Sequence, residues 1–131
     1  IMTQDPETVP GTTSIAETIA FFASEAKHRS YPVVDKMGML LGLVSRADAL
    51  RWQFEDAPRH ETLAEAISDA SQPTADTEAP LAFVADLMIE TGIGRIPILD
   101  PTSGRLVGIL SRHDLLKARR IEADAEYLRS R

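Results

Sequence analysis

Two nine-residue stretches combine the residue types in this chain that could do chemistry. Gly42–Leu50 reads GLVSRADAL and Gly108–Leu116 reads GILSRHDLL, so both run Gly, two apolar residues, Ser, Arg, any residue, Asp. Glycine lets a ligand or another backbone approach closely, and a Ser that begins a helix leaves free N–H groups that favour an anion. Asp can accept hydrogen bonds from a ribose diol, and Arg suits phosphate. The stretch therefore predicts part of a nucleotide site, present twice.

The same residues also have a structural interpretation that needs no ligand. Ser-x-x-Asp ahead of an apolar run is the pattern of a capping box, in which Ser and an acid three residues later satisfy backbone N–H groups at a helix start. A cap uses the same two side chains at the same places. The residues alone therefore leave a ligand site and a helix cap open as alternatives.

The position of the two stretches indicates an internal duplication. Asp48 and Asp114 are 66 residues apart in a chain of 131 residues, so the offset is about half the chain. Pro32 and Pro97 are 65 apart, so one residue is lost before them and one is regained in the following turn, where a change of length costs little. We therefore expect two copies of one structural unit.

Each copy is predicted to contain a strand, a helix, two strands and a second helix. In the first copy a capping box at 14–17 opens a helix, strands follow at 32–34 and 40–44, and a second helix begins near Ser45 and ends near Phe54. The second copy has a helical apolar stripe from Leu81, strands at 96–99 and 106–110, and a helix from Ser111. The predicted fold class is α+β, with two repeats related by a pseudo-two-fold axis that form one compact module.

The limits of the repeats follow from the same offset. The first repeat is predicted at 1–56, a linker at 57–66, and the second repeat with a C-terminal helix at 67–131. Ile1 corresponds to Ile67, and residues 63–66 have no counterpart ahead of Ile1, so we expect a chain cut from a longer protein inside the opening element of its first repeat. The last helix carries a thin apolar stripe that needs a partner surface, formed by Ala118, Ile121, Ala125 and Leu128.

Composition and charge argue against several classes of protein. The net charge of −6 without a dominant basic stripe argues against a nucleic-acid partner, and the lack of cysteine excludes disulfide and thiolate chemistry. No apolar run approaches the ~20 residues of a membrane span. The histidines lack metal-ligand spacing, and the acidic residues Glu55, Asp56 and Glu61 are interpreted as a solvated linker rather than a Mg²⁺ site. No Ser–His–acid set suggests a nucleophile, so no catalytic or metal site is predicted.

Two halves that each end in Gly-apolar-apolar-Ser-x-x-Asp resemble the tandem cystathionine-β-synthase (CBS) domain pair. In both halves the stretch follows a Pro-apolar-apolar-Asp strand, Pro32–Asp35 and Pro97–Asp100, and the resemblance covers nearly the whole chain. It implies a regulatory module rather than an enzyme, in which adenine nucleotides bind in the cleft between the repeats. ATP, ADP or AMP is then a regulatory ligand, and no cofactor is required.

A narrower resemblance concerns the parent protein. Ser30–Asp35, Gly42–Trp52 and the basic-acidic last helix are similar to the cytoplasmic CBS region of bacterial ClC-type chloride channels and transporters. That resemblance implies a membrane channel or transporter domain as partner and a place on the cytoplasmic face of a membrane. CBS pairs also associate through their helices, so a homodimer is expected, with apolar faces such as those of Phe22 and Trp52 to cover.

The resemblance to the CBS pair assigns two candidate sites, each combining the Asp of one repeat with the first strand of the other. The primary site comprises Thr8, Val9, His28, Ser30, Tyr31, Ser111, Arg112 and Asp114. The secondary site comprises Thr74, Ala75, Ile93, Arg95, Ser45, Arg46 and Asp48. The His28 imidazole is either a stacking partner for the base or a solvated histidine at a helix end. The alternative function is a ligand-free structural dimerisation module, in which both Ser-x-x-Asp stretches are helix caps.

Overall fold

Two units make up the chain. The computed structural model describes residues 2–4, 6–67 and 72–118. The first unit is formed by Glu7–Gln72 with Gly104–Leu106, and the second unit by Ile1–Pro6, Pro73–Ser103 and Val107–Arg131. The first unit holds the stretch around Asp48 and the second unit the stretch around Asp114. The predicted apolar stripe at 121–128 lies outside the described residues.

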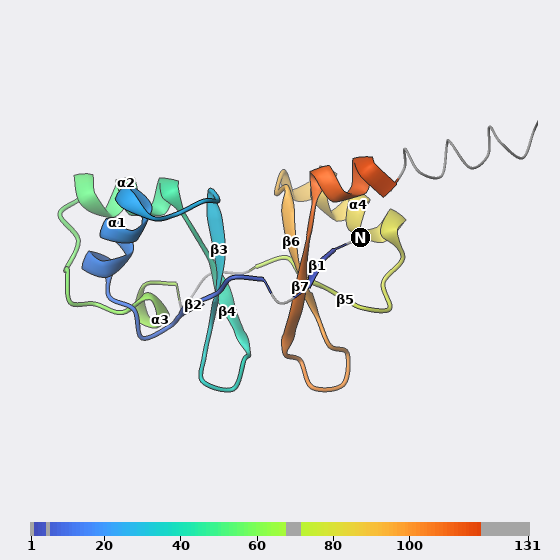
Figure 1. The fold of residues 1–131 in the computed structure, drawn as a ribbon, viewed down its shortest axis with the longest axis horizontal. Coiled ribbons are helices and arrows are strands. Elements are labelled where there is room, and N and C mark those ends of the chain that lie inside the picture. Colours follow the sequence, from blue (N-terminus) through green and yellow to red (C-terminus); the bar gives the residue numbers. More distant parts are fainter. Residues whose placement is uncertain (1, 5, 68–71, 119–131) are drawn as a thin grey trace, which may run out of the picture. The chain divides into compact units, whose positions relative to one another are not determined.

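The first unit is a three-stranded sheet with helices (Figure 1). Its elements in chain order are β2 (Val9–Pro10), α1 (Ile15–Ser24), β3 (Ser30–Val34), β4 (Leu40–Ser45), α2 (Arg46–Phe54) and α3 (Leu63–Ala66). β3 lies in the middle of the sheet, parallel to β2 and antiparallel to β4. The predicted capping box opens α1, since Ser14 Oγ accepts the Glu17 N–H at 3.1 Å and the Glu17 carboxylate accepts the Ser14 N–H at 3.3 Å.

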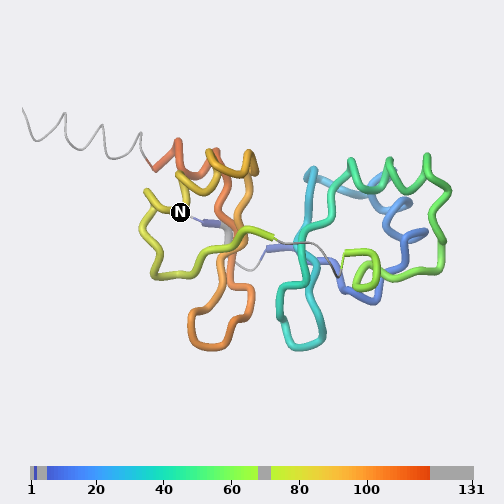
Figure 2. The backbone as a smooth tube through the Cα atoms, turned by 180° about the vertical axis from the view of Figure 1, so that it is seen from behind, coloured from blue at the N-terminus to red at the C-terminus, as the bar shows by residue number. Residues whose placement is uncertain are grey.

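The second unit repeats this arrangement and adds one strand from the start of the chain. Its elements are β5 (Ala75–Asp76), α4 (Leu81–Thr91), β6 (Arg95–Leu99) and β7 (Leu106–Ser111), and residues 112–118 are helical. The added strand, β1 (Thr3–Gln4), pairs antiparallel with β7 and gives the sheet order β1-β7-β6-β5. Figure 2 shows β1 beside β7, so a strand from the start of the chain joins a strand from its second half in one sheet.

The strand registers confirm the duplication. Val9 pairs with Val33 in the first unit and Ala75 pairs with Ile98 in the second, so the offset is 66 in one strand and 65 in the other. The missing residue is regained in the turn between β6 and β7, as predicted. The predicted fold class, an α+β chain of two sheet-and-helix repeats, is confirmed. Among the described residues, no helix is both long enough and apolar enough to span a membrane.

An aspartate shapes the turn after the proline-containing strand of each unit, β3 or β6. Asp35 Oδ1 accepts the Met39 N–H at 3.0 Å, and Asp100 Oδ1 accepts the N–H groups of Thr102 and Ser103 at 2.7 and 3.0 Å. The N–H groups of Ser103 and Thr102 hold the pKa of the Asp100 carboxyl below its ordinary value, because they stabilise the charged form. Asp is favoured at such positions because its side chain reproduces a backbone turn.

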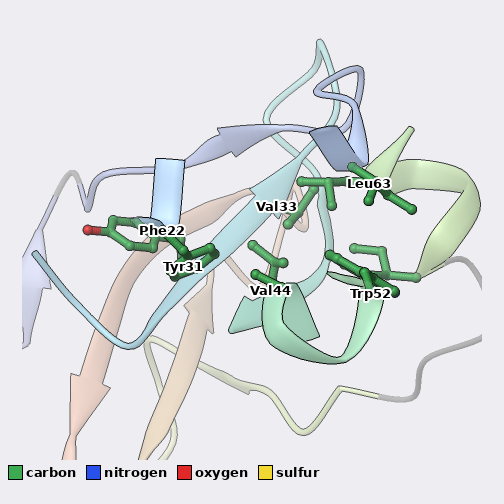
Figure 3. Packing of buried hydrophobic residues seen from close by; sticks show 9 residues of the cluster. Phe22, Tyr31, Val33, Val44, Trp52 and Leu63 are labelled. Atoms are coloured by element: carbon green, nitrogen blue, oxygen red, sulfur yellow. The ribbon is translucent and has the colours of Figure 1, made fainter. Parts of the chain in front are cut away.

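The core of the first unit gathers side chains from its sheet and its helices. Figure 3 shows Val33, Val44, Trp52 and Leu63 directed toward one another within this cluster, which also includes Phe22. Phe22 and Trp52 are both buried inside the unit. The expectation that they form apolar faces for a partner to cover is therefore wrong, because both side chains are packed in the core of their own unit.

Residues 57–66, predicted as a linker, pack against the other elements of the first unit. Leu63 is completely buried, its N–H donates to Thr13 O at 2.8 Å, and the Ile15 N–H donates to Glu61 O at 2.9 Å. Glu55 and Asp56, just ahead of this segment, are exposed. The limits 1–56, 57–66 and 67–131 stay a prediction, with the middle segment in contact with the first unit.

We expect Trp52→Ala to lower the free energy of unfolding by about 3–5 kcal/mol, because it removes a large side chain from a packed core. The matched control is Phe54→Ala on the same helix. Trp52 is 7% exposed and Phe54 is 89% exposed, so the control should change stability by less than about 0.5 kcal/mol. Urea-induced unfolding measures both values, and equal losses would contradict this packing.

Candidate functional site

Both repeated stretches form capping boxes at a strand-to-helix junction. In the first unit the Ser45 N–H donates to Asp48 Oδ2 at 2.8 Å, and Ser45 Oγ accepts the Asp48 N–H at 3.1 Å. In the second unit the Ser111 N–H donates to Asp114 Oδ2 at 2.9 Å, and Ser111 Oγ accepts the Asp114 N–H at 3.0 Å. The structural interpretation of the stretch is therefore confirmed in both units, and each Asp keeps its Oδ1 outside the cap.

The second carboxylate oxygen distinguishes the two junctions. Asp48 Oδ1 accepts a hydrogen bond from Arg51 Nη1 at 3.1 Å, three residues along the helix. The equivalent of Arg51 in the second unit is Lys117, which is exposed. Within residues 2–4, 6–67 and 72–118, Asp114 Oδ1 has no hydrogen-bond or ion-pair partner. The Oδ1 of Asp114 is therefore available to accept a hydrogen bond from a ligand.

Gly42, the first residue of the stretch, makes room for a core side chain. A Cβ at this position would lie 3.3 Å from Ile67 Cδ1, which is tighter than almost all real contacts. The expectation that this glycine admits a ligand or another backbone is wrong for Gly42. The neighbour is the Ile67 side chain, which belongs to the core of the first unit.

A cavity of about 390 Å³ opens beside the first strand and first helix of the first unit. Three predicted site residues, Thr8, Val9 and Tyr31, line it together. The other lining residues are Glu7, Pro10, Thr13, Glu17, Thr18 and Phe21. The Phe21 and Tyr31 rings meet edge to face with centroids 5.0 Å apart, so the cavity has aromatic, hydroxyl and carboxylate groups on its walls.

The Tyr31 side chain joins this cavity to the loop ahead of β3. Tyr31 is buried, and its hydroxyl oxygen accepts the N–H groups of Lys27 and His28 at 2.7 and 3.0 Å. The His28 ring lies 5.6 Å from the Tyr31 ring, measured between centroids, and its side chain is exposed. His28 and Ser30 do not line the cavity. The structure therefore brings together Thr8, Val9 and Tyr31 and leaves these two outside.

Three polar residues of the cavity wall, Glu7, Glu17 and Thr18, were not predicted from the sequence. Thr18 lies on the buried face of α1 between Ile15 and Phe22, and its hydroxyl donates to Ser14 O at 2.8 Å. A polar residue on the apolar face of a helix was the available signal. Glu17 was assigned to the cap alone, and Glu7 lies in a segment without a pattern. The cavity wall includes no Lys or Arg.

The residues predicted for the secondary site do not line the small cavity that lies beside β5. Ala75 is buried in the core of the second unit, and Thr74, Ile93 and Arg95 are half-buried. A cavity of about 130 Å³ lies next to β5, but its walls come from other residues, among them Met2, Asp76 and Val84. Val84 is equivalent to Thr18 of the first unit. This cavity is therefore smaller than the cavity of the first unit and lacks the hydroxyl of Thr18.

The two arginines of the repeated stretch are exposed. The Arg112 guanidinium carbon would lie 3.5 Å from a Cβ on Gly94, so Arg112 covers the backbone ahead of β6. The Arg112 N–H donates to Gly94 O at 2.8 Å, and the Arg46 N–H donates to Arg29 O at 2.8 Å in the first unit. The backbone junction is thus the same in both units. Across the described ranges, no group of three His, Asp or Glu side chains could hold a metal ion.

The two sheet-and-helix units, each with a Ser-x-x-Asp junction, define a tandem-repeat α+β module. The chain belongs to the CBS domain family, whose model matches residues 1–55 and 64–121. The predicted tandem CBS pair is therefore confirmed, and such pairs are typically regulatory rather than catalytic modules.

The chain is similar to solved CBS pairs along nearly their whole length and to part of a longer relative. A crystal structure of CBSX2 in complex with AMP is 25% identical, covers 92% of this chain and 94% of its own, and has a TM-score of 0.75. The CBS domain pair of protein MJ0100, in complex with 5-methylthioadenosine and S-adenosyl-L-methionine, is 24% identical, covers 93% and 94%, and has a TM-score of 0.72, which shows the shared fold. The protein named putative zinc metalloprotease Rip3 of Mycobacterium tuberculosis is 30% identical over 120 residues. Those residues are 88% of this chain and 29% of Rip3, so the chain spans less than a third of that relative.

We expect Ser45→Ala and Ser111→Ala each to lower the free energy of unfolding by about 0.5–2 kcal/mol, because each removes the acceptor that caps a helix. Ser24→Ala is the control, since Ser24 Oγ donates to Ala20 O near the end of α1 and caps nothing. Thermal and urea unfolding compare the three variants. A loss for Ser24→Ala as large as for the two caps would contradict the capping role.

Proposed function

We propose that this CBS pair is a regulatory module that binds an adenine nucleotide and transmits the occupancy of the site to another part of a longer protein. The observation that carries the proposal is the cavity of the first unit. Its volume of about 390 Å³ falls within the range of ~300–1,000 Å³ that is usual for small-molecule sites. Val9, Phe21 and Tyr31 give it an apolar side for a base, and its threonines offer polar groups.

In this proposal the second unit supplies the ribose and phosphate contacts of the primary site. Asp114 Oδ1 accepts from the ribose hydroxyls while Oδ2 remains in the cap. Ser111 begins the helix that faces the phosphate, and the exposed Arg112 neutralises its charge. His28 and Ser30 stay candidates for contacts at the rim. The AMP complex of CBSX2, at 25% identity, supports this class of ligand.

The secondary site is proposed to be weaker or empty. Asp48 Oδ1 is engaged by Arg51, so a ribose would have to compete with an existing hydrogen bond. The neighbouring cavity beside β5 is about a third of the volume of the first, at about 130 Å³. These differences favour one functional ligand site over two equivalent sites.

Ligand binding regulates only if the ligand binds one arrangement of the protein better than another. We propose that the regulated domain belongs to the same polypeptide, because the chain spans 29% of its Rip3 relative. A membrane-associated parent with this module on its cytoplasmic face fits the role. The ClC-type channel or transporter predicted from the sequence stays a prediction, and the Rip3 relative favours a metalloprotease as the parent class.

A second candidate function is a structural dimerisation module without a ligand. It is favoured by the exposed apolar side chains of Leu50, Phe54, Ile89 and Leu116 on the helices, and by the capping boxes, which give both Ser-x-x-Asp stretches a structural role. Both functions include a homodimer, so the mass of the protein in solution does not separate them. Binding of an adenine nucleotide does.

We expect AMP to bind the unmodified chain, and Asp114→Ala to weaken that binding by about 1.5–3 kcal/mol, the usual worth of a hydrogen bond to a charged group. The matched control is Asp48→Ala, which loses the same cap and should weaken AMP binding much less. Calorimetric titration gives the affinities, and unfolding curves show that both variants lose similar stability. If AMP, ADP and ATP at millimolar concentration give no heat, the ligand-free dimerisation module is the better account.

We also expect AMP to bind more tightly than ATP, because Glu7 and Glu17 on the cavity wall would repel the additional negative charge of ATP. Glu7→Gln should reduce the ratio of AMP affinity to ATP affinity by about 1.5–5-fold, since exposed charges interact by ~0.2–1 kcal/mol. Glu17→Gln should act in the same direction and still allow the cap, because Gln serves at that position. Glu55→Gln, exposed and outside the cavity, is the control. A preference for ATP that none of these variants alters would contradict the role of the two carboxylates.

A further inference from the structure

Residues 59–64 pack against the turn between β2 and α1 in the first unit. The Leu63 N–H donates to Thr13 O at 2.8 Å, and the Ala64 N–H donates to Gly11 O at 2.9 Å. A glycine permits this close approach, because a Cβ on Gly11 would lie 3.3 Å from the Ala64 Cβ. Leu63 is completely buried in the core of the unit (Figure 3). Two backbone bonds and one buried side chain therefore fix the turn.

Residues 59–64 also provide acceptors for the start of α1. The Ile15 N–H donates to Glu61 O at 2.9 Å, and the Ala16 N–H donates to Arg59 O at 3.1 Å. These are the first two residues of the helix, and N–H groups at that position have no acceptor within the helix itself. The beginning of α1 is therefore held by the same segment that fixes the turn ahead of it.

The turn and the start of α1 form one wall of the cavity of about 390 Å³. Pro10 at the end of β2, Thr13 in the turn, and Glu17 and Thr18 in α1 all line this cavity. Thr13 is the direct link, since it lines the cavity and its carbonyl oxygen accepts the Leu63 N–H. The segment at 59–64 itself contributes nothing to the wall, so it acts on a ligand only through these residues.

The same segment leads along the chain toward the second unit. The first unit extends to Gln72, and the chain enters the second unit at Pro73. Residues 59–64 and α3 are therefore the last elements of the first unit before that entry. A change in their packing alters how the connection between the units is anchored.

We propose that residues 59–64 position the wall of the ligand cavity, and that ligand binding and the packing of this segment stabilise each other. This coupling rests on the proposed function, because it needs a ligand in the cavity. Such coupling is reciprocal, so packing that raises the affinity for a ligand is itself strengthened by the ligand. Leu63 is a positioning residue, which acts through Thr13 without touching the ligand.

The two states of this device are the segment packed and the segment released. Release exposes the Leu63 side chain and removes the acceptors of the Ile15 and Ala16 N–H groups. It also frees the turn, so Thr13 no longer has a fixed position on the cavity wall. The ligand binds the packed state better because the wall is complete only there, and this difference is what regulation by a ligand requires.

Amide hydrogen exchange of the unmodified chain, with and without saturating AMP, tests the coupling. Four amides report on the packing of the segment, namely Ile15, Ala16, Leu63 and Ala64. We expect them to exchange at least about fivefold more slowly with AMP, the lower end of the usual range of coupling between sites. The internal control is the Met39 amide, which donates to Asp35 Oδ1 in the turn after β3 and should not respond.

Leu63→Ala supplies a second measurement, because Leu63 does not line the cavity. We expect this variant to weaken AMP binding by at least about fivefold in calorimetric titrations made where unfolding curves show it fully folded. Leu63→Val removes less of the side chain and should weaken binding less. It replaces Leu63→Ala if that variant does not fold. His60→Ala, exposed on the same segment, is the matched control and should change the affinity by less than about twofold.

The outcomes separate this coupling from the proposed function. If AMP binds and the four amides exchange at unchanged rates, the coupling is wrong and the proposed function stands. The same holds if the folded Leu63 variants bind AMP as tightly as the unmodified chain, because Leu63 then has a structural role alone. If AMP does not bind at millimolar concentration, the proposed function fails and the coupling fails with it.

Discussion

The reciprocal hydrogen bonds between a serine and an aspartate at the strand-to-helix junction fix the geometry of both units. The backbone leaves an extended strand at Ser45 or Ser111 and enters a helix at the next residue, so the first N–H groups of that helix need acceptors. The Oδ2 of the Asp accepts a hydrogen bond from the serine N–H, and this bond stabilises the turn. The direction of the helix follows from this junction, and with it the burial of Trp52. The same bonds fix the orientation of each Asp carboxylate and therefore the position of its Oδ1.

The duplication has conserved this junction and changed what surrounds it. In the first unit Arg51 donates to Asp48 Oδ1, Trp52 is buried in the core, and Thr18 provides a hydroxyl to the cavity. In the second unit the corresponding residues are Lys117, Ala118 and Val84. The first unit therefore has the cavity lined by Thr8, Val9 and Tyr31, and the second has the Asp114 Oδ1 that no described residue engages. A duplicated scaffold can specialise in this way because single side chains outside the junction do not alter the backbone.

Local patterns were sufficient to predict the elements, the caps and the 66-residue offset. The helix starts are indicated by the serines at 14, 45 and 111, whose caps form within three residues. A proline lies in β3 and in β6. Properties that depend on residues far apart in the chain were not predictable in the same way. The contact of Ile67 with Gly42, the role of the Tyr31 hydroxyl as an acceptor, and the packing of residues 57–66 all depend on tertiary placement. The candidate site was predicted in part for this reason. Thr8, Val9 and Tyr31 follow from the family pattern, whereas Glu17 and Thr18 line the cavity because of how α1 packs.

The central claim is that the two aspartates share the capping role and only Asp114 has an oxygen available for a ligand. The side-chain carboxyl carbons of Asp48 and Asp114, observed by carbon-13 nuclear magnetic resonance during a titration with AMP, test this claim most directly. The account predicts a saturable change in the Asp114 signal and an unchanged Asp48 signal. An equal response of the two carboxyl carbons, or a saturable response of Asp48 alone, would contradict it.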